Sequence, residues 1–267
     1  MTNRRIACSV AGSDPTGGAG LQLDLQVFRS LGVHGAAVPT ALTIQDTTKV
    51  HRVLPTFPSV LLDQLRVLLA DLPPHALKLG MLATDDVVRN VALGLEMLPA
   101  SVPIVIDPIL FASDGAPLLE RRAWPMLQEL FGRAALVTPN RPEAEALLGR
   151  DASTRQGAED AARAFVDEFG AEATLVKGGH ADGAPDDVLA FREGDEIRVE
   201  WLPGERIETG PVHGTGCALS AAVTAELAKG CGLREAVVTA HVFVADAIRD
   251  SFAAGGGARL LGFPASA

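Results

Sequence analysis

Short apolar runs alternate with helical patterns along almost the whole chain. The run VPIVIDP at 102–108 is rich in β-branched residues, as is ATLVK at 173–177, and such runs are typical of strands buried on both faces. Between the runs, apolar residues recur at helical spacing, for example at 59–72 and at 84–98, where Thr84 is suited to cap a helix. This alternation predicts an α/β fold of three layers, α/β/α, with a mostly parallel central sheet.

The pattern changes after residue 186. The segment DVLAFREGDEIRVEWL at 187–202 contains two alternating runs around Gly194, which predicts a β-hairpin at an edge of the sheet. No linker or break in composition divides the chain, so we expect one domain over residues 1–267.

Polar residues follow several of the predicted strands. Asp107 ends the run VPIVID, Asn140 and Glu143 follow ALVTP, and Lys177 ends ATLVK. In open α/β sheets, ligands bind at the carboxyl ends of the strands. Carboxylates there can hold Mg²⁺ beside substrate phosphates, and a lysine can neutralise phosphate charge. Their shared position at strand ends predicts one common site.

The stretch PVHGTGCALSAAVTAEL at 211–227 combines glycines with a helix start. The first amides of a helix lack internal partners and carry the positive end of its dipole, so Gly214, Thr215 and Gly216 can form an anion site. A helix N-terminus can also lower the pKa of a thiol, which would let Cys217 accept a proton from a substrate hydroxyl. The alternatives are a simple helix start capped by Thr215 and a cysteine that serves as a small buried apolar residue.

Each of the other candidates also has a structural interpretation. Glu143 can be a first-turn acid that favours the helix dipole, and Lys177 can extend from a strand end into solvent. Asp24 and Gln45 can bind a polar ligand near the strand ends, or can face solvent.

Composition and missing motifs exclude several classes. The formal net charge is −10 and no Lys/Arg run is present, which argues against nucleic-acid binding. The sequence has no uninterrupted apolar run of about 20 residues, as a membrane span needs. Three cysteines without a signal peptide indicate a soluble protein of the reducing cytoplasm. P-loop, zinc-site and nucleophile-elbow motifs are absent, and the glycine-rich turn near residue 17 does not fit the dinucleotide fingerprint.

Seven ordered motifs resemble one family. They are AGSDPTGGAGLQLDL, ALTIQDT, KLGML, IDPIL, TPNRPEAEALLG, VKGGH and HGTGCALSAAVTAELAKG. Together they are similar to the hydroxymethylpyrimidine/phosphomethylpyrimidine kinases of thiamine biosynthesis, within the ribokinase-like superfamily. The resemblance implies a ribokinase-like fold, ATP and Mg²⁺ as cofactors, a small pyrimidine substrate and a homodimer. It implies phosphorylation of 4-amino-5-hydroxymethyl-2-methylpyrimidine and then of its monophosphate.

The resemblance also implies a role for each matching residue. The pyrimidine pocket would be lined by Gly12, Asp24, Gln45, Met81 and Ile109, with Asp24 and Gln45 as its polar contacts. Gly214, Thr215 and Gly216 would form the anion hole, and Cys217 would be the base for the substrate hydroxymethyl group. Lys177 would contact the ATP phosphates and Asn140 would lie beside the nucleotide. Asp107 and Glu143 would organise Mg²⁺ and its waters.

The chain departs from the family pattern at Ser113, where relatives have a lysine, at Pro211 and Val212, and in the ending GGGARLLGF. The missing lysine favours the first phosphorylation over the second. A pyridoxal kinase of the same superfamily and a non-catalytic pyrimidine-binding protein remain alternatives, and an NAD-dependent oxidoreductase is a weaker one.

Overall fold

The computed structural model describes residues 4–112, 115–179 and 184–263. Within these residues, nine strands form a single sheet in the order β3-β2-β1-β4-β5-β6-β7-β8-β9. The strands are β1 (Ile6–Ser13), β2 (His34–Gln45), β3 (Val50–Pro55), β4 (Ala76–Leu79), β5 (Ile104–Ile106), β6 (Leu136–Val137), β7 (Ala173–Val176), β8 (Asp187–Glu193) and β9 (Glu196–Leu202). The strands from β2 to β7 pair in parallel, and the ribbons β2–β3 and β7–β8–β9 are antiparallel.

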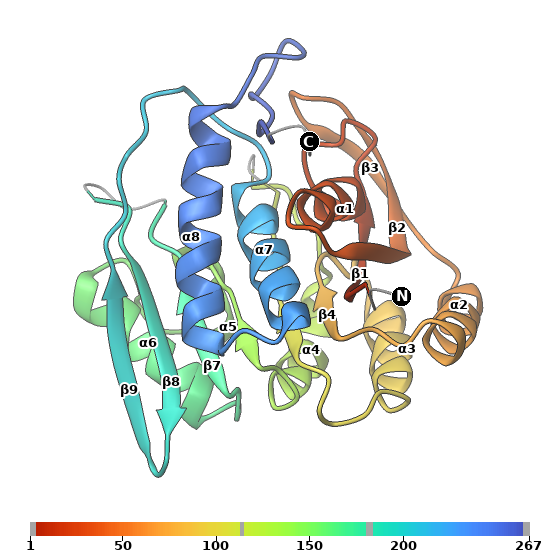
Figure 1. The fold of residues 1–267 in the computed structure, drawn as a ribbon, viewed down its shortest axis with the longest axis horizontal. Coiled ribbons are helices and arrows are strands. Elements are labelled where there is room, and N and C mark those ends of the chain that lie inside the picture. Colours follow the sequence, from red (N-terminus) through yellow and green to blue (C-terminus); the bar gives the residue numbers. More distant parts are fainter. Residues whose placement is uncertain (1–3, 113–114, 180–183, 264–267) are drawn as a thin grey trace.

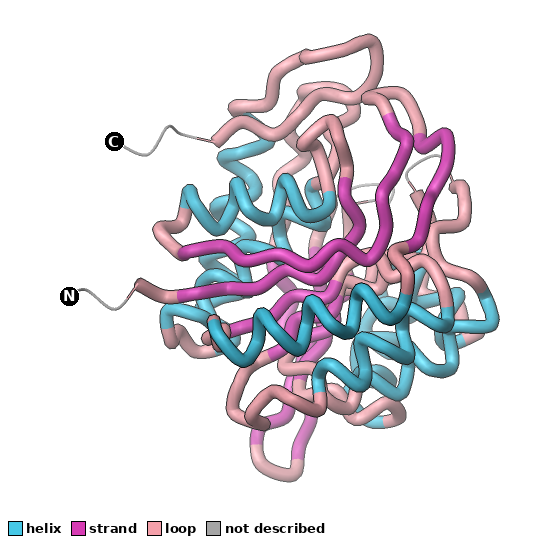
Figure 2. The backbone as a smooth tube through the Cα atoms, turned by 90° about the vertical axis from the view of Figure 1, so that its right-hand side faces the viewer, coloured by secondary structure: helices cyan, strands magenta, loops and turns pink. Residues whose placement is uncertain are grey.

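Two layers of helices cover the sheet (Figures 1 and 2). The helices are α1 (Gly20–Ser30), α2 (Pro58–Asp71), α3 (Asp85–Leu95), α4 (Trp124–Phe131), α5 (Arg141–Leu148), α6 (Arg155–Asp167), α7 (Thr215–Lys229) and α8 (Leu233–Arg249), with a 3₁₀ turn at Arg121–Ala123. The helices α1, α7 and α8 bury one face, while α2 to α6 bury the other. The expected three-layer α/β/α fold with an edge hairpin is confirmed.

Two local predictions, the helix cap at Thr84 and the hairpin turn at Gly194, are confirmed. Thr84 caps α3 by accepting a hydrogen bond from the Val87 amide, as predicted. Gly194 has a φ of +63° in the turn between β8 and β9, a conformation that glycine adopts without strain. None of the helices among the described residues is long and apolar enough to cross a bilayer.

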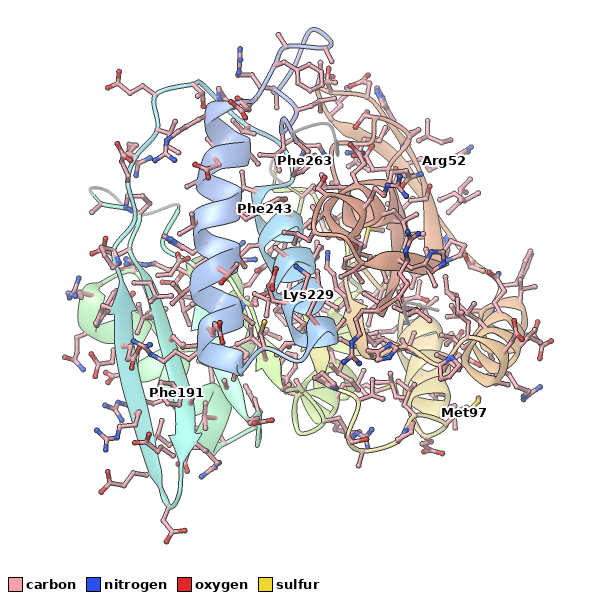
Figure 3. All side chains as sticks on the ribbon, viewed as in Figure 1. Arg52, Met97, Phe191, Lys229, Phe243 and Phe263 are labelled. Atoms are coloured by element: carbon pink, nitrogen blue, oxygen red, sulfur yellow. The ribbon has the colours of Figure 1, made fainter. Side chains whose placement is uncertain are left out.

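The sequence did not predict β3 or α4. Every residue of β3 is exposed or half-buried, so the strand lacks the apolar alternation that marks a buried one. It forms because its backbone pairs with β2, and Arg52 projects from its outer side (Figure 3). The β2–β3 ribbon extends beyond the helices as a flap whose inner face carries Thr43 and Gln45 at the cavity described below.

The last described residues run back across the carboxyl edge of the sheet. Phe263 stacks on Phe243 of α8 at a ring-centroid distance of 5.7 Å (Figure 3). Just before it, the Ala258 amide donates to the carbonyl of Thr47 in the β2–β3 turn at 2.9 Å. We call the segment 251–263 the C-terminal strap. It holds the flap turn against the body of the protein.

Candidate active site

A cavity of about 350 Å³ opens at the carboxyl ends of β1, β4, β5 and β7, beneath the flap. Most of the predicted site residues line it, from segments that are far apart in the sequence. They are Gly12, Gln45, Met81, Asp107, Ile109, Asn140, Glu143, Lys177, Gly214, Thr215, Gly216 and Cys217. The parallel strands explain this convergence, because their carboxyl ends all meet at one edge of the sheet.

The N-terminus of α7 forms one end of the cavity. Gly214 precedes the helix with a φ of +79°, and a Cβ there would lie 1.9 Å from the carbonyl oxygen of Gly18, so only glycine fits. The first intrahelical bond runs from the Ala218 amide to Gly214. Among the described residues, no partner accepts from the amides of Thr215, Gly216 and Cys217, so these three are free to bind an anion.

Lys177 lies beside these amides. Its Nζ is 2.8 Å from Asp107 Oδ1, and a Cβ on Gly216 would approach that Nζ to 2.9 Å. Burial alone would lower the pKa of Lys177, but the carboxylates of Asp107 and Glu143 outweigh it and raise the pKa. The lysine is therefore a fixed positive charge at the anion site.

Asp107 is already surrounded by donors. Its Oδ1 accepts from Lys177 and from Thr138, and its Oδ2 accepts from the Ser220 hydroxyl at 3.1 Å. Burial would raise the pKa of Asp107, but Lys177 and Lys78 outweigh it and lower the pKa. Asp107 is thus an ionised anchor for Lys177, and any metal it contacts must share it with these donors.

Glu143 combines its two predicted roles. It forms a capping box with Asn140, in which each side chain accepts from the other residue's amide at 2.8 Å. It is also 3% exposed and lines the cavity. Burial, together with the charge of Asp107, raises the pKa of Glu143 to about 7 against the opposing effect of Lys177. Glu143 is therefore both a helix cap and a buried acid that protonates more readily than a free glutamate.

Cys217 differs from the expectation. The sequence predicted a lowered thiol pKa, but burial and the carboxylates of Asp107 and Asp24 raise it to about 11, although Lys78 acts in the opposite direction. The thiol is neutral at physiological pH, and a neutral thiol is a poor proton acceptor.

Asp24 also differs from the expectation. It does not line the cavity: its side chain is fully buried and contacts Ser9 and Lys78 beneath α7. A buried carboxylate needs a charged partner, and Lys78 of β4 provides it from the neighbouring strand. The other predicted ring contacts, Gly12, Gln45, Met81 and Ile109, do reach the cavity.

The comparisons with known proteins agree with this geometry. The phosphomethylpyrimidine kinase family model matches residues 14–261. The chain belongs to the phosphomethylpyrimidine kinase family. It is 39% identical to a hydroxymethylpyrimidine/phosphomethylpyrimidine kinase of Staphylococcus aureus over 93% of this chain and 90% of that protein.

Two solved structures show the same fold. The phosphomethylpyrimidine kinase of Clostridium difficile superposes with a TM-score of 0.78 and 30% identity, covering 92% of this chain and 100% of that chain. An ADP complex of Bacillus subtilis pyridoxal kinase superposes with a TM-score of 0.85 and 32% identity, covering 98% of each chain. The resemblance to this family, and the kinase class with it, is confirmed.

The sequence placed Asp14 in a polar cluster at a strand end but gave no individual role to it, to Lys78 or to His213, and the structure brings all three to the site of the kinase. Lys78 sits inside the run ALKL and is fully buried, and a lysine within an apolar strand was the available signal for it. Asp14 and His213 meet at the cavity rim, where His213 Nε2 lies 3.1 Å from Asp14 Oδ2. His213 was visible within the HGTGC motif, but its partner lies 199 residues away.

Two of the departures from the family pattern contact each other in the kinase. The Arg259 amide donates to the Pro211 carbonyl, and the His213 amide donates to the Arg259 carbonyl, both at 2.9 Å. Val212 therefore forms a parallel bridge with the strap. The altered loop and the altered ending are two halves of one backbone contact. The third departure, Ser113, lies outside the described residues.

Proposed function

We propose that this kinase transfers the γ-phosphoryl group of ATP to the hydroxymethyl oxygen of 4-amino-5-hydroxymethyl-2-methylpyrimidine, and then phosphorylates the monophosphate. One domain, residues 1–267, carries both activities in this proposal. The observation that supports it most is the pairing of Lys177 with the free amides of Thr215, Gly216 and Cys217. Such preorganised donors stabilise the charge on a phosphoryl group during transfer.

The acceptor ring would lie under the flap, between Gly12, Met81 and Ile109, with Gln45 as its polar contact. Its hydroxymethyl group would then point toward Cys217. Because the thiol is neutral, Cys217 would orient that hydroxyl by hydrogen bonding, and base catalysis by Cys217 stays a prediction. The loose transition state of phosphoryl transfer places most of the catalytic demand on charge and position.

The residues present fit nucleotide phosphates and Mg²⁺. The described residues contain no cluster of three or more His, Cys, Asp or Glu that could hold a metal alone, so the phosphates must complete the coordination, as is usual for Mg²⁺. Glu143 and Asp107 would hold the ion through water, next to Asn140 and the nucleotide. When bound, Mg²⁺ neutralises phosphate charge. A cation there would favour the ionised form of Glu143, whose pKa is raised mainly by burial.

The test is one ADP-release assay with the purified kinase and Mg-ATP. The acceptors are the hydroxymethylpyrimidine, its monophosphate and pyridoxal, the last because of the likeness to the B. subtilis pyridoxal kinase. We expect turnover with the first two acceptors and a lower kcat/KM with pyridoxal. Absence of turnover with both pyrimidines would refute the proposal.

We also propose that the kinase is a homodimer in the cytoplasm. The outer face of the flap exposes Leu42, Ile44 and Leu54, and Phe57, which caps α2 just after the flap, is 78% exposed. Leu42 and Leu54 are directly opposite each other across the ribbon. Contiguous exposed apolar surface is typical of interfaces, and sedimentation equilibrium measures the mass in solution.

A further inference from the structure

A hydrogen-bonded chain at the cavity rim joins Asp14, His213 and Gln45. His213 Nε2 lies 3.1 Å from Asp14 Oδ2 and 3.0 Å from the side-chain amide of Gln45. The proposed phosphoryl transfer uses Gln45 but gives no role to the other two residues. Both contacts meet at a single ring nitrogen, so they cannot be independent of each other.

Asp14 decides where the hydrogen on His213 lies. Asp14 also accepts from the amide and the hydroxyl of Thr16, both at 2.9 Å. Burial would raise the pKa of Asp14, but the hydrogen bonds from His213 and Thr16 outweigh it and lower the pKa. An ionised carboxylate only accepts hydrogen bonds, so the hydrogen between Asp14 and His213 belongs to Nε2.

His213 and Thr43 both restrict the orientation of the Gln45 side-chain amide, and in the same direction. A ring nitrogen that carries a hydrogen has no lone pair left for an amide donor. At the other end of the amide, Thr43 Oγ1 lies 3.1 Å from Gln45 and also 2.9 Å from the Ser13 carbonyl. The carbonyl can only accept, so the one hydroxyl hydrogen of Thr43 points to Ser13, and a lone pair of Oγ1 faces Gln45.

The Nε2 hydrogen of His213 therefore excludes the Gln45 nitrogen from the His213 side, where the oxygen can share that hydrogen with Asp14, and the lone pair of Thr43 favours the nitrogen on the Thr43 side. In the structure the amide has the other orientation, with its nitrogen 3.0 Å from His213 Nε2 and its oxygen 3.1 Å from Thr43 Oγ1. The two ends of an amide have the same size and shape, so their hydrogen-bond partners decide between the orientations. The orientation with the nitrogen toward His213 would set donor against donor.

We propose that Asp14 and His213 are positioning residues that fix the donor–acceptor order of Gln45 and thereby select an aminopyrimidine over a pyridoxal-type ring. The inference rests on the proposed function. Next to its hydroxymethyl group, the aminopyrimidine has an amino donor followed by a ring-nitrogen acceptor. Pyridoxal has an aldehyde acceptor in the place of this amino donor. An amide held one way pairs with one ring and opposes the other.

The experiment measures kcat/KM for both rings in the wild type, His213→Leu and Asp14→Asn, together with equilibrium binding of both rings without ATP. His213→Leu removes one of the two contacts that orient the amide, and Asp14→Asn allows His213 to present a lone pair. We expect each variant to lower the preference for the aminopyrimidine by about tenfold, equivalent to about 1.4 kcal/mol. In ¹⁵N NMR, the Asp14→Asn substitution should move hydrogen from Nε2 to Nδ1 of His213.

The matched control is His51→Leu. His51 lies on β3 of the same flap, is bonded to Asp46 at 2.7 Å, and has a 42% exposed side chain. Its substitution should leave the preference within about twofold of wild type. If His213→Leu and Asp14→Asn also stay within about twofold, in turnover or in binding, the inference is wrong. A wild type that phosphorylates neither pyrimidine overturns the proposed function instead.

Discussion

Two lysine–aspartate pairs lie near the start of α7, and their surroundings differ. Lys177 and Asp107 are at the cavity, with the lysine side chain 14% exposed. Lys78 and Asp24 are beneath α7, and both side chains are fully buried. We call Lys177–Asp107 the open pair, because it faces the ligand site. We call Lys78–Asp24 the sealed pair, because neither side chain is exposed, although Lys78 lies at the wall of the cavity.

The difference shows that a pair of the same two residue types can have two different roles. Burial would lower the pKa of Lys78, but Asp24 outweighs it and raises the pKa, so the sealed lysine stays charged. Its Nζ also donates to the Cys217 carbonyl at 3.1 Å, which fixes the first turn of α7. The sealed pair thus positions the amides that the open pair complements.

Breaking the open pair should have the largest effect on activity. Lys177→Met removes the charge beside the free amides of α7, and we expect kcat/KM to fall by about 10³-fold, as with loss of a preorganised donor. Stability should change less than activity, because Asp107 keeps its bonds from Thr138 and Ser220. Steady-state kinetics and denaturant unfolding of the same preparation test this. Near-normal kcat/KM would contradict it.

Breaking the sealed pair should act first on stability. Lys78→Met leaves Asp24 with only Ser9 as a bonding partner among the residues that contact it in the described structure, and an unpaired buried charge costs about 3–5 kcal/mol. Adding Asp24→Leu should recover most of the loss, because the buried charge is then gone. Urea unfolding of Lys78→Met and of the double variant measures both changes in stability. A Lys78→Met variant as stable as wild type would be inconsistent with a charged pair.

Glu143 tests the charge balance around the open pair. Glu143→Gln keeps the capping box and removes the acid. Because folding raises the pKa from 4.5 to about 7, wild type should lose stability relative to the variant as pH rises from 4.5 to 7, by at most about 3 kcal/mol. Thermal unfolding across that range measures it, and a pH-independent difference would argue against the raised pKa. Mg²⁺-dependent activity should fall in the same variant.

Cys217 should give the smallest effect. With a neutral thiol that orients the hydroxymethyl group, Cys217→Ala should lower kcat by about tenfold, whereas loss of a general base costs about 10²–10⁴-fold. Single-turnover kinetics separates the two, and Cys217→Ser serves as the control that keeps a hydrogen-bonding group. A loss of kcat within the range of about 10²–10⁴-fold would support Cys217 as the general base.

The sequence predicted what depends on local pattern. The layers, the hairpin at 187–202 and the cluster of Asp107, Asn140 and Lys177 follow from periodicity and from polar residues placed after apolar runs. The rest depends on partners distant in the chain. Asp24 and Lys78 are 54 residues apart, and neither position alone indicates a buried pair. Gln45 and His213 are 168 residues apart, and β3 depends on backbone pairing that side chains do not reveal.

The C-terminal strap has a consequence for the order in which the protein assembles. The flap turn at Thr47 and the loop carrying His213 both take backbone partners from residues 257–259. These residues follow every strand and helix of the described structure. The sheet and α7 can therefore assemble before the strap docks, and the binding pocket gains a complete rim only when residues 257–259 are in place.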